Sequence, residues 1–168
     1  DIMHKTTSYS AADILKENPE YKDLLYDDGS TASEQYELWN AYFKKYLSER
    51  AKKGLFVELA SHTYTKYTLQ GLYNFYDFAA DPKLRTLSSN TLNLWWTDWA
   101  LEQINAIRGG AKSRVYQEDS TTGTSDGAYA MSWYYLDMGF YRGRHPGFTC
   151  LATSTHRLPL VVMDIALD

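Results

Sequence analysis

Two short loops, at residues 56–64 and 108–116, carry the side chains whose types and spacing suit chemistry. The first loop combines a carboxylate with an imidazole, and the second holds two guanidinium groups. Two helices separated by a short break are predicted between the loops, so the chain runs along one helix and returns along the other. Both loops are therefore expected at the same end of a helical hairpin. The residues expected to meet there are Glu58, His62, Arg108 and Arg114.

Eliminative cleavage of an acidic polysaccharide is the reaction favoured by these groups. It needs a cation beside the uronic carboxylate to acidify the neighbouring proton, a base to remove that proton, and an acid for the leaving oxygen. Arg108 or Arg114 would neutralise the carboxylate. The candidate bases and acids are His62, Tyr64, Tyr67 and Tyr116.

Glycoside hydrolysis is the alternative reaction. It needs two carboxyl groups about 5 to 9.5 Å apart, and the chain offers Glu58, Asp98 and Glu102. Two further alternatives are a non-catalytic glycan-binding or assembly module and a cluster that only stabilises the fold. In the last case Glu58 would cap a helix and Arg108 would neutralise helix carbonyl groups.

Aromatic side chains are unusually abundant, with 15 Tyr, 5 Trp and 6 Phe among 168 residues. Such rings suit a wet groove that stacks sugars, but a helical core closed by Tyr at its edges has the same composition. The expected partner is a polysaccharide or an oligosaccharide. The residues predicted to bind it are Trp95, Trp99, Asp98, Glu102 and Lys112.

Charge and motif content argue against several other functions. The formal net charge of -4 disfavours nucleic acid and an anionic membrane as partners, because both require a basic field. No apolar run approaches the ~20 residues of a membrane span, and the single cysteine, Cys150, permits no intrachain disulfide. No zinc, phosphate-loop or dinucleotide motif occurs, so neither a metal nor a cofactor is expected.

The spacing of apolar residues predicts an all-α protein built from antiparallel helical hairpins. We expect one helical domain over residues 1–168. Its expected parts are an N-terminal segment at 1–30, core hairpins at 31–116, an exposed loop at 117–127, and a third helix with an irregular tail at 128–168.

Several local signals place the helices. Ser10 is expected to cap the first helix, Asn18-Pro19 to end it, and Asp81-Pro82 to start the longest one. Gly71 costs a helix about 1 kcal/mol relative to Ala, which indicates that another element packs closely against it. Residues 158–167 suit either a helix or a strand. The expected helices are 11–17, 33–53, 63–80, 82–107 and 128–138.

The predicted helix at 82–107 carries Asp98 and Glu102 on a face that is apolar one turn earlier. Carboxylates on such a face need partners, because burying an unpaired charge is too costly. The pairing is either structural or part of a functional site. The nearest cations in the sequence are Arg108, Lys112 and Arg114.

Residues 56–64 (FVELASHTY), 72–79 (LYNFYDFA) and 81–84 (DPKL) resemble the alternating inner and outer helices of (α/α) toroid carbohydrate-active proteins. Among characterised proteins, the chain resembles the heparinase and alginate lyase type. Secreted bacterial toroid proteins of unassigned activity are similar. This resemblance covers roughly residues 33–116 and implies a polysaccharide-degrading enzyme that is secreted or periplasmic in a bacterium. A full toroid has more hairpins than this chain supplies. We therefore expect a fragment of a larger toroid, or an open arc that other copies or chain segments complete.

Overall fold

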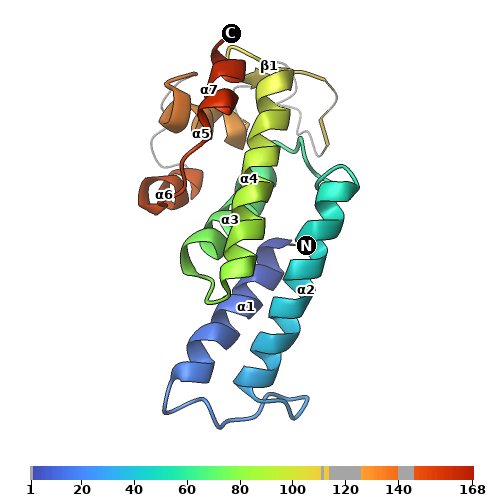
Figure 1. Cartoon of the computed structure of the whole chain (residues 1–168), viewed down its shortest axis with the longest axis vertical. Coiled ribbons are helices and arrows are strands. Elements are labelled where there is room, and N and C mark those ends of the chain that lie inside the picture. Colours follow the sequence, from blue (N-terminus) through green and yellow to red (C-terminus); the bar gives the residue numbers. More distant parts are fainter. Residues whose placement is uncertain (1, 111, 114–125, 140–145) are drawn as a thin grey trace.

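The computed structural model describes residues 2–110, 112–113, 126–139 and 146–168 (Figure 1). Helices packed against one another form nearly all of the regular structure in these ranges, and the strands there make a single two-stranded hairpin. The all-α prediction is confirmed. The helices are α1 (Ile2–Glu17), α2 (Ala32–Lys52), α3 (Thr65–Phe78), α4 (Pro82–Glu102), α5 (Gly127–Leu136), α6 (Pro146–Thr153) and α7 (Leu160–Leu167), and the strands are β1 (Gln103–Ile104) and β2 (Ile107–Arg108).

Helix α1 begins well before the predicted helix at 11–17, so the proposed N-cap at Ser10 is wrong. One side of α1 is buried and packs against α2 and α3. Half of that side consists of Thr and Tyr, which weakens its apolar periodicity in the sequence. The predicted end before Asn18-Pro19 is confirmed. The buried residues of α1 are Ile2, Thr6, Tyr9 and Ala12.

The predicted break between α3 and α4 is also confirmed. Asp81 caps α4 by accepting a hydrogen bond from the Lys83 backbone N–H at 2.7 Å. Its Oδ2 atom also lies 2.6 Å from Lys44 Nζ and 2.8 Å from Asn40 Nδ2, both on α2. The hydrogen bond from Lys44 holds the pKa of the Asp81 carboxyl well below its usual range. One carboxylate therefore joins α4 to α2 at the closed end of the α3–α4 hairpin.

Helix α4 stops before its predicted end at Ile107. Residues 103–108 instead form the antiparallel hairpin of β1 and β2. Asn105 and Ala106 adopt φ values of 51° and 69°, the left-handed conformation that a tight two-residue hairpin turn requires. This reversal carries Arg108 back along the last turn of α4.

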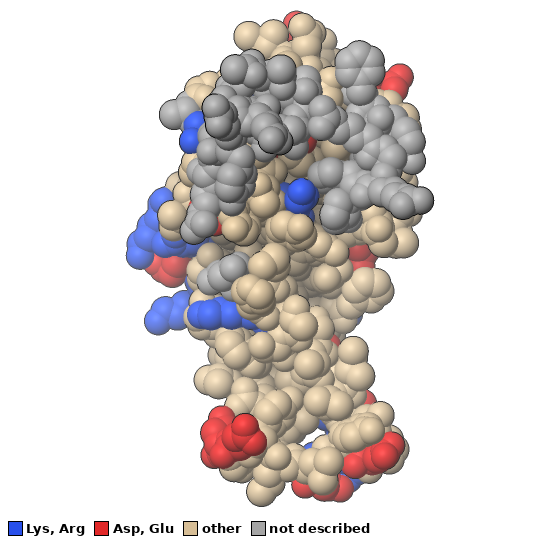
Figure 2. Space-filling view, turned by 180° about the vertical axis from the view of Figure 1, so that it is seen from behind, with Lys and Arg blue, Asp and Glu red and all other residues tan. Residues whose placement is uncertain are grey.

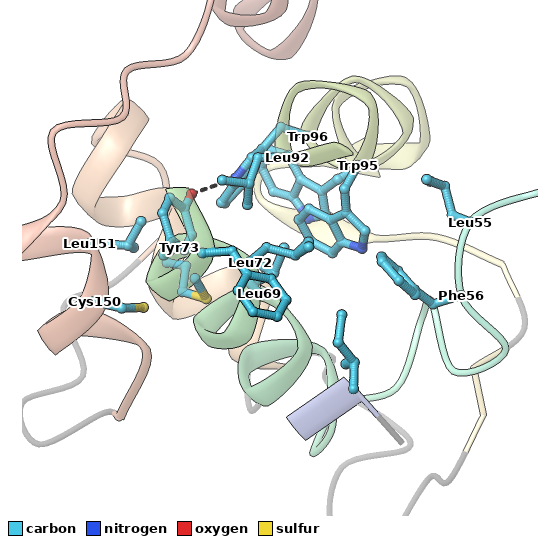
Figure 3. Packing of buried hydrophobic residues seen from close by; sticks show 14 of the residues in the cluster. Leu55, Phe56, Leu69, Leu72, Tyr73, Leu92, Trp95, Trp96, Cys150 and Leu151 are labelled. Atoms are coloured by element: carbon cyan, nitrogen blue, oxygen red, sulfur yellow. Dashed lines mark hydrogen bonds between the residues drawn. The ribbon is translucent and has the colours of Figure 1, made fainter. Parts of the chain in front are cut away.

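The core centres on α4, which contacts α2, α3 and α7. Figure 3 shows Trp95 and Trp96 of α4 packed over Leu72 of α3. The Trp96 indole N–H donates to the Tyr73 hydroxyl oxygen at 2.9 Å, so this buried polar pair is satisfied (Figure 3). The nearly continuous apolar pattern of α4 predicts that this helix is buried on two sides. Such burial requires helices on both sides of it.

The C-terminal part is more regular than predicted. Much of the expected irregular tail consists of α6 and α7, and residues 158–167 contain a helix rather than a strand. Helix α7 packs on α4, and Gln103 Nε2 donates to the Ala166 carbonyl oxygen at 2.8 Å. Of the predicted exposed loop at 117–127, the structure describes Asp126 and Gly127, and both are buried at the start of α5.

Charged side chains are grouped rather than evenly spread. Figure 2 shows acidic residues at the lower end of the rear face and Lys and Arg residues about halfway up it. Uncharged side chains cover much of the described surface between these groups. Among the helices of the described ranges, none is long and apolar enough to cross a membrane.

Candidate functional site

Arg108 is the central polar residue at the open end of the α3–α4 hairpin. The Gly109 N–H donates to the Glu102 carbonyl oxygen at 2.8 Å, which holds the start of the second loop against α4. Arg108 Nε lies 2.8 Å from Glu102 Oε2. Its Nη2 lies 2.7 Å from the same oxygen and also contacts Asp98 Oδ2. The predicted ion pairing of both carboxylates is confirmed, with Arg108 as their partner.

The guanidinium group is far more buried than the carboxylates that it binds. The Arg108 side chain is 3% exposed, whereas those of Asp98 and Glu102 are 33% and 52% exposed. Two of the three guanidinium nitrogens are held by these carboxylates, which fixes the orientation of the group. The third nitrogen, Nη1, is buried and has no hydrogen-bond partner within the described ranges.

Asp126 forms the second half of the cluster. Its side chain is 3% exposed and caps α5 by accepting a hydrogen bond from the Ala128 N–H at 2.8 Å. Lys112 Nζ lies 4.0 Å from Asp126 Oδ2. The next residue, Gly127, donates its N–H to the His62 carbonyl oxygen at 3.3 Å, which joins the first loop to the start of α5.

The charges of three nearby groups act on the Asp126 carboxyl. Burial raises the pKa of Asp126, and the charges of Lys112, His62 and Arg108 partly oppose that rise. His62 and Arg108 are themselves buried. The structure therefore brings His62, Arg108 and Lys112 together around Asp126, which we call the hairpin-end cluster.

The other predicted catalytic residues lie on the same loop and helix start as His62, or outside the described ranges. Glu58 is half-buried in a turn, and its carbonyl oxygen accepts the Ser61 N–H at 3.2 Å. Tyr64 and Tyr67 are half-buried before and within the first turn of α3. Two predicted site residues lie outside the described residues, namely Arg114 and Tyr116.

Trp95 and Trp99 do not line a groove. Their side chains belong to the fully buried core, at 1% and 0% exposure. Trp96 packs edge to face against both rings, at centroid distances of 5.0 and 5.3 Å. The sugar-stacking role predicted for Trp95 and Trp99 is therefore corrected to a role in the core, because neither ring is accessible to a ligand.

Sequence reasoning missed Asp126 as a member of the cluster. Its signal was present, because an Asp directly before a Gly-Ala helix start is a common N-cap. The preceding run of Ser, Thr and Gly dominates the local pattern and instead predicts an exposed loop. Its burial follows from the contact between α5 and α3, which no local pattern records.

A second buried polar group surrounds His156, between α6 and α7. Its Nε2 lies 3.1 Å from Asn93 Oδ1 of α4, and its Nδ1 lies 3.3 Å from the Tyr135 hydroxyl of α5. Burial lowers the pKa of His156 to about 4, so the imidazole is neutral at physiological pH. The partners are distant in sequence, and no spacing rule would have found this network.

The hairpin-end cluster contains groups that differ from a metal-ligand set. Within the described ranges, no group of three or more His, Cys, Asp or Glu residues is placed to hold a metal ion. What the cluster offers is an imidazole, two cations and a carboxyl group with a raised pKa. These are the components of acid–base chemistry on an anionic substrate.

The fold and the cluster define an all-α, aromatic-rich protein with a buried ionic cluster at the open end of its central hairpin. Comparison with protein-family models, curated proteins and solved structures finds no match. The activity is therefore inferred from the chemistry of the cluster.

Proposed function

We propose that the protein cleaves an acidic polysaccharide, by elimination. The observation that supports this proposal is the gathering of His62, Arg108 and Lys112 around Asp126 at the hairpin end. Elimination from a uronic sugar needs cations at the substrate carboxylate together with groups that accept and return a proton. The described cluster contains each of these types of group.

Lys112 is the best candidate to bind the uronate carboxylate. Its ammonium lies 4.0 Å from Asp126 Oδ2, which is beyond hydrogen-bond distance. Arg108 supplies a fixed guanidinium whose charge also acts on Asp126, with Nη1 not bonded to any described residue. Arg114 belongs to the same proposal as a further cation. Neutralising the carboxylate lowers the pKa of the adjacent C–H. Removal of the C–H proton is the step that limits elimination in water.

The proton transfers are assigned to an imidazole, three tyrosine hydroxyls and a carboxyl group. His62, Tyr64, Tyr67 and Tyr116 are the proposed bases for the C–H proton. Asp126 is the proposed acid for the leaving oxygen, because burial raises its pKa and so favours its protonated form more than in an exposed carboxyl group. Its Oδ1 accepts the Ala128 N–H, and its Oδ2 lies 4.0 Å from Lys112 Nζ.

Glycoside hydrolysis is the second candidate, and the pairing of Asp98 with Glu102 favours it. Both carboxylates contact the same Arg108 nitrogen, so they lie close together, and both are partly exposed. A retaining hydrolase needs carboxyl groups about 5 Å apart. Glu58 is a further candidate for such a pair. A hydrolase would release ordinary reducing ends, whereas a lyase creates an unsaturated uronate that absorbs ultraviolet light.

The proposal also covers the location of the protein and the helical hairpins that would complete a toroid. Acidic polysaccharides in or beyond the bacterial envelope require a secreted or periplasmic enzyme. The resemblance to (α/α) toroid proteins suggests that further helical hairpins, from other copies or chain segments, extend the arc. The antiparallel packing of α3 and α4, with α4 buried on two sides, supports this arrangement.

A lysine replacement tests the proposed chemistry. Lys112→Met keeps the aliphatic stem and removes the charge, and we expect it to lower kcat/KM on a uronate polysaccharide by about 100-fold or more. Lys45→Met is the matched control, because Lys45 is exposed on α2. Ultraviolet absorbance of the product measures turnover, and thermal unfolding checks the fold. Full turnover by folded Lys112→Met would refute the role of this cation.

A further inference from the structure

The α1–α2 hairpin contains a groove that is separate from the hairpin-end cluster. It has a volume of about 570 Å³, within the range of pockets that bind small ligands. Helices α1 and α2 form the lower half of the molecule, whereas β1 and α5 lie in the upper half (Figure 1). Its lining residues are His4, Thr7, Ser8, Ala11, Tyr26, Gln35 and Trp39.

The lining combines aromatic rings with uncharged hydrogen-bonding groups. Trp39 and Tyr26 supply the rings, and Thr7, Ser8 and Gln35 supply hydroxyl and amide groups. In the part of the chain that the structure describes, no carboxylate, ammonium or guanidinium group lines the groove. Flat apolar faces edged by neutral donors and acceptors match a sugar ring, whose faces carry C–H groups and whose rim carries hydroxyls.

The rim of the groove is held in place before any ligand binds. The Tyr26 N–H donates to the Ser30 carbonyl oxygen at 2.8 Å, which closes the turn that presents Tyr26. Gln35 Nε2 donates to Asp28 Oδ2 at 3.0 Å and to Ser30 Oγ at 2.8 Å. This orients the Gln35 amide and leaves its carbonyl oxygen as an acceptor, so little side-chain entropy would be lost on binding.

Trp39 is similarly supported from behind. It is half-buried, and its ring packs edge to face on Tyr42 at 5.8 Å and tilted on Phe43 at 6.2 Å between centroids. Phe43 belongs to the fully buried core. A ring fixed on one side and open to a groove on another is a stacking platform of low conformational cost.

We propose that this groove binds a short neutral oligosaccharide. An anionic ligand is disfavoured, because the Asp28 carboxylate lies 3.0 Å from the Gln35 amide nitrogen of the lining. The site is distinct from the proposed catalytic cluster and does not depend on its chemistry. In an enzyme that acts on a polymer, it would anchor uncharged sugar units at the opposite end of the molecule.

Titration with neutral trisaccharides of glucose, mannose, galactose or N-acetylglucosamine tests the proposal. Each sugar is added separately, and NMR follows the indole N–H signal of Trp39, assigned with Trp39→Phe, and the side-chain amide of Gln35. We expect at least one sugar to shift both signals with a Kd below about 10 mM. The absence of any such shift would overturn the proposal.

A variant that fills the groove provides a second test of the proposal. Ala11→Leu adds bulk in the groove at an exposed helical position, and we expect it to weaken binding about tenfold, a loss of about 1.4 kcal/mol. Ala41→Leu, at an exposed position of α2 outside the lining, should bind as the original chain does. Equal binding by both variants would overturn the assignment. Neutral sugars report on this groove alone, so a failure here is distinguishable from a failure of uronate cleavage.

Discussion

Arg108 links the chemistry of single residues to the stability of the hairpin end. It is buried, bridges two carboxylates of α4 and follows the β-turn that ends this helix. The pairing was predictable, because carboxylates at positions 98 and 102 on an apolar face require a nearby cation. The choice of Arg108 over Lys112 was not predictable, since it depends on the reversal at Asn105 and Ala106.

Replacing Arg108 should destabilise the fold. We expect Arg108→Met to lower the free energy of unfolding by about 2 kcal/mol, less than for a fully buried pair, because both carboxylates can be rehydrated. Urea titration measures the loss. Arg85→Met, at an exposed position of the same helix, is the control and should change stability little. Equal stability of the two variants would show that the bridge contributes nothing.

His156 should make stability depend on pH in a defined window. Its pKa is lowered to about 4 in the folded state by burial, from about 6.5 in the unfolded chain. The unfolded chain therefore binds more protons between these values, and stability falls as pH drops from about 6.5 to about 4. The maximum loss is about 3 kcal/mol.

A variant isolates this contribution. His156→Gln removes the titrating group, so the fall in stability between these pH values should be smaller than in the original chain. Asp81 does not confuse the result, because its lowered pKa affects stability only below about pH 4, the unfolded value. Chemical denaturation at a series of pH values gives the comparison. Identical slopes in both proteins would contradict the assignment.

At the scale of elements, the strongest local signals predicted the structure well. The N-cap at Asp81 and the break before Pro82 are confirmed, because a carboxylate cap and a fixed proline φ act through local geometry. The start of α1 and the end of α4 were missed. Both depend on packing and on a left-handed turn, which helical periodicity does not report.

The packing of α1 on α3 is also testable at this scale. The sequence predicts close packing at Gly71, and the structure confirms it: a Cβ there would lie 3.0 Å from Thr6 Cγ2 of α1. Thr6 is buried and its hydroxyl donates to the Met3 carbonyl oxygen at 2.9 Å, so it cannot move aside easily. We expect Gly71→Ala to destabilise by about 1 kcal/mol, despite its higher helix propensity.

A double-mutant cycle separates this contact from other effects. Thr6→Ser removes the contacting methyl group and keeps the hydroxyl, so combining it with Gly71→Ala should recover about 1 kcal/mol as coupling energy. Thr7→Ser is the matched control, because Thr7 is exposed on the same helix. Thermal or urea unfolding gives the values. Additive effects of Thr6→Ser and Gly71→Ala would mean that the two helices do not meet at this point.

At the scale of the whole molecule, the sequence predicts the helical class and part of the hairpin-end cluster. The hairpin places both loops at one end, and His62, Arg108 and Lys112 meet there. Asp126 and the network around His156 were missed, because they join segments separated by many residues. Trp95 and Trp99 were misassigned, since a buried ring and a sugar platform have the same residue type and spacing.

The mass of the products released from a uronate polysaccharide in heavy-oxygen water tests the central claim most directly. Elimination breaks the glycosidic bond without adding water, so we predict unsaturated fragments that carry no heavy oxygen. Saturated fragments, with one heavy oxygen gained for each bond broken, would show hydrolysis and contradict the proposed role of the hairpin-end cluster. The absence of fragments from every uronate polymer offered would contradict the enzyme itself.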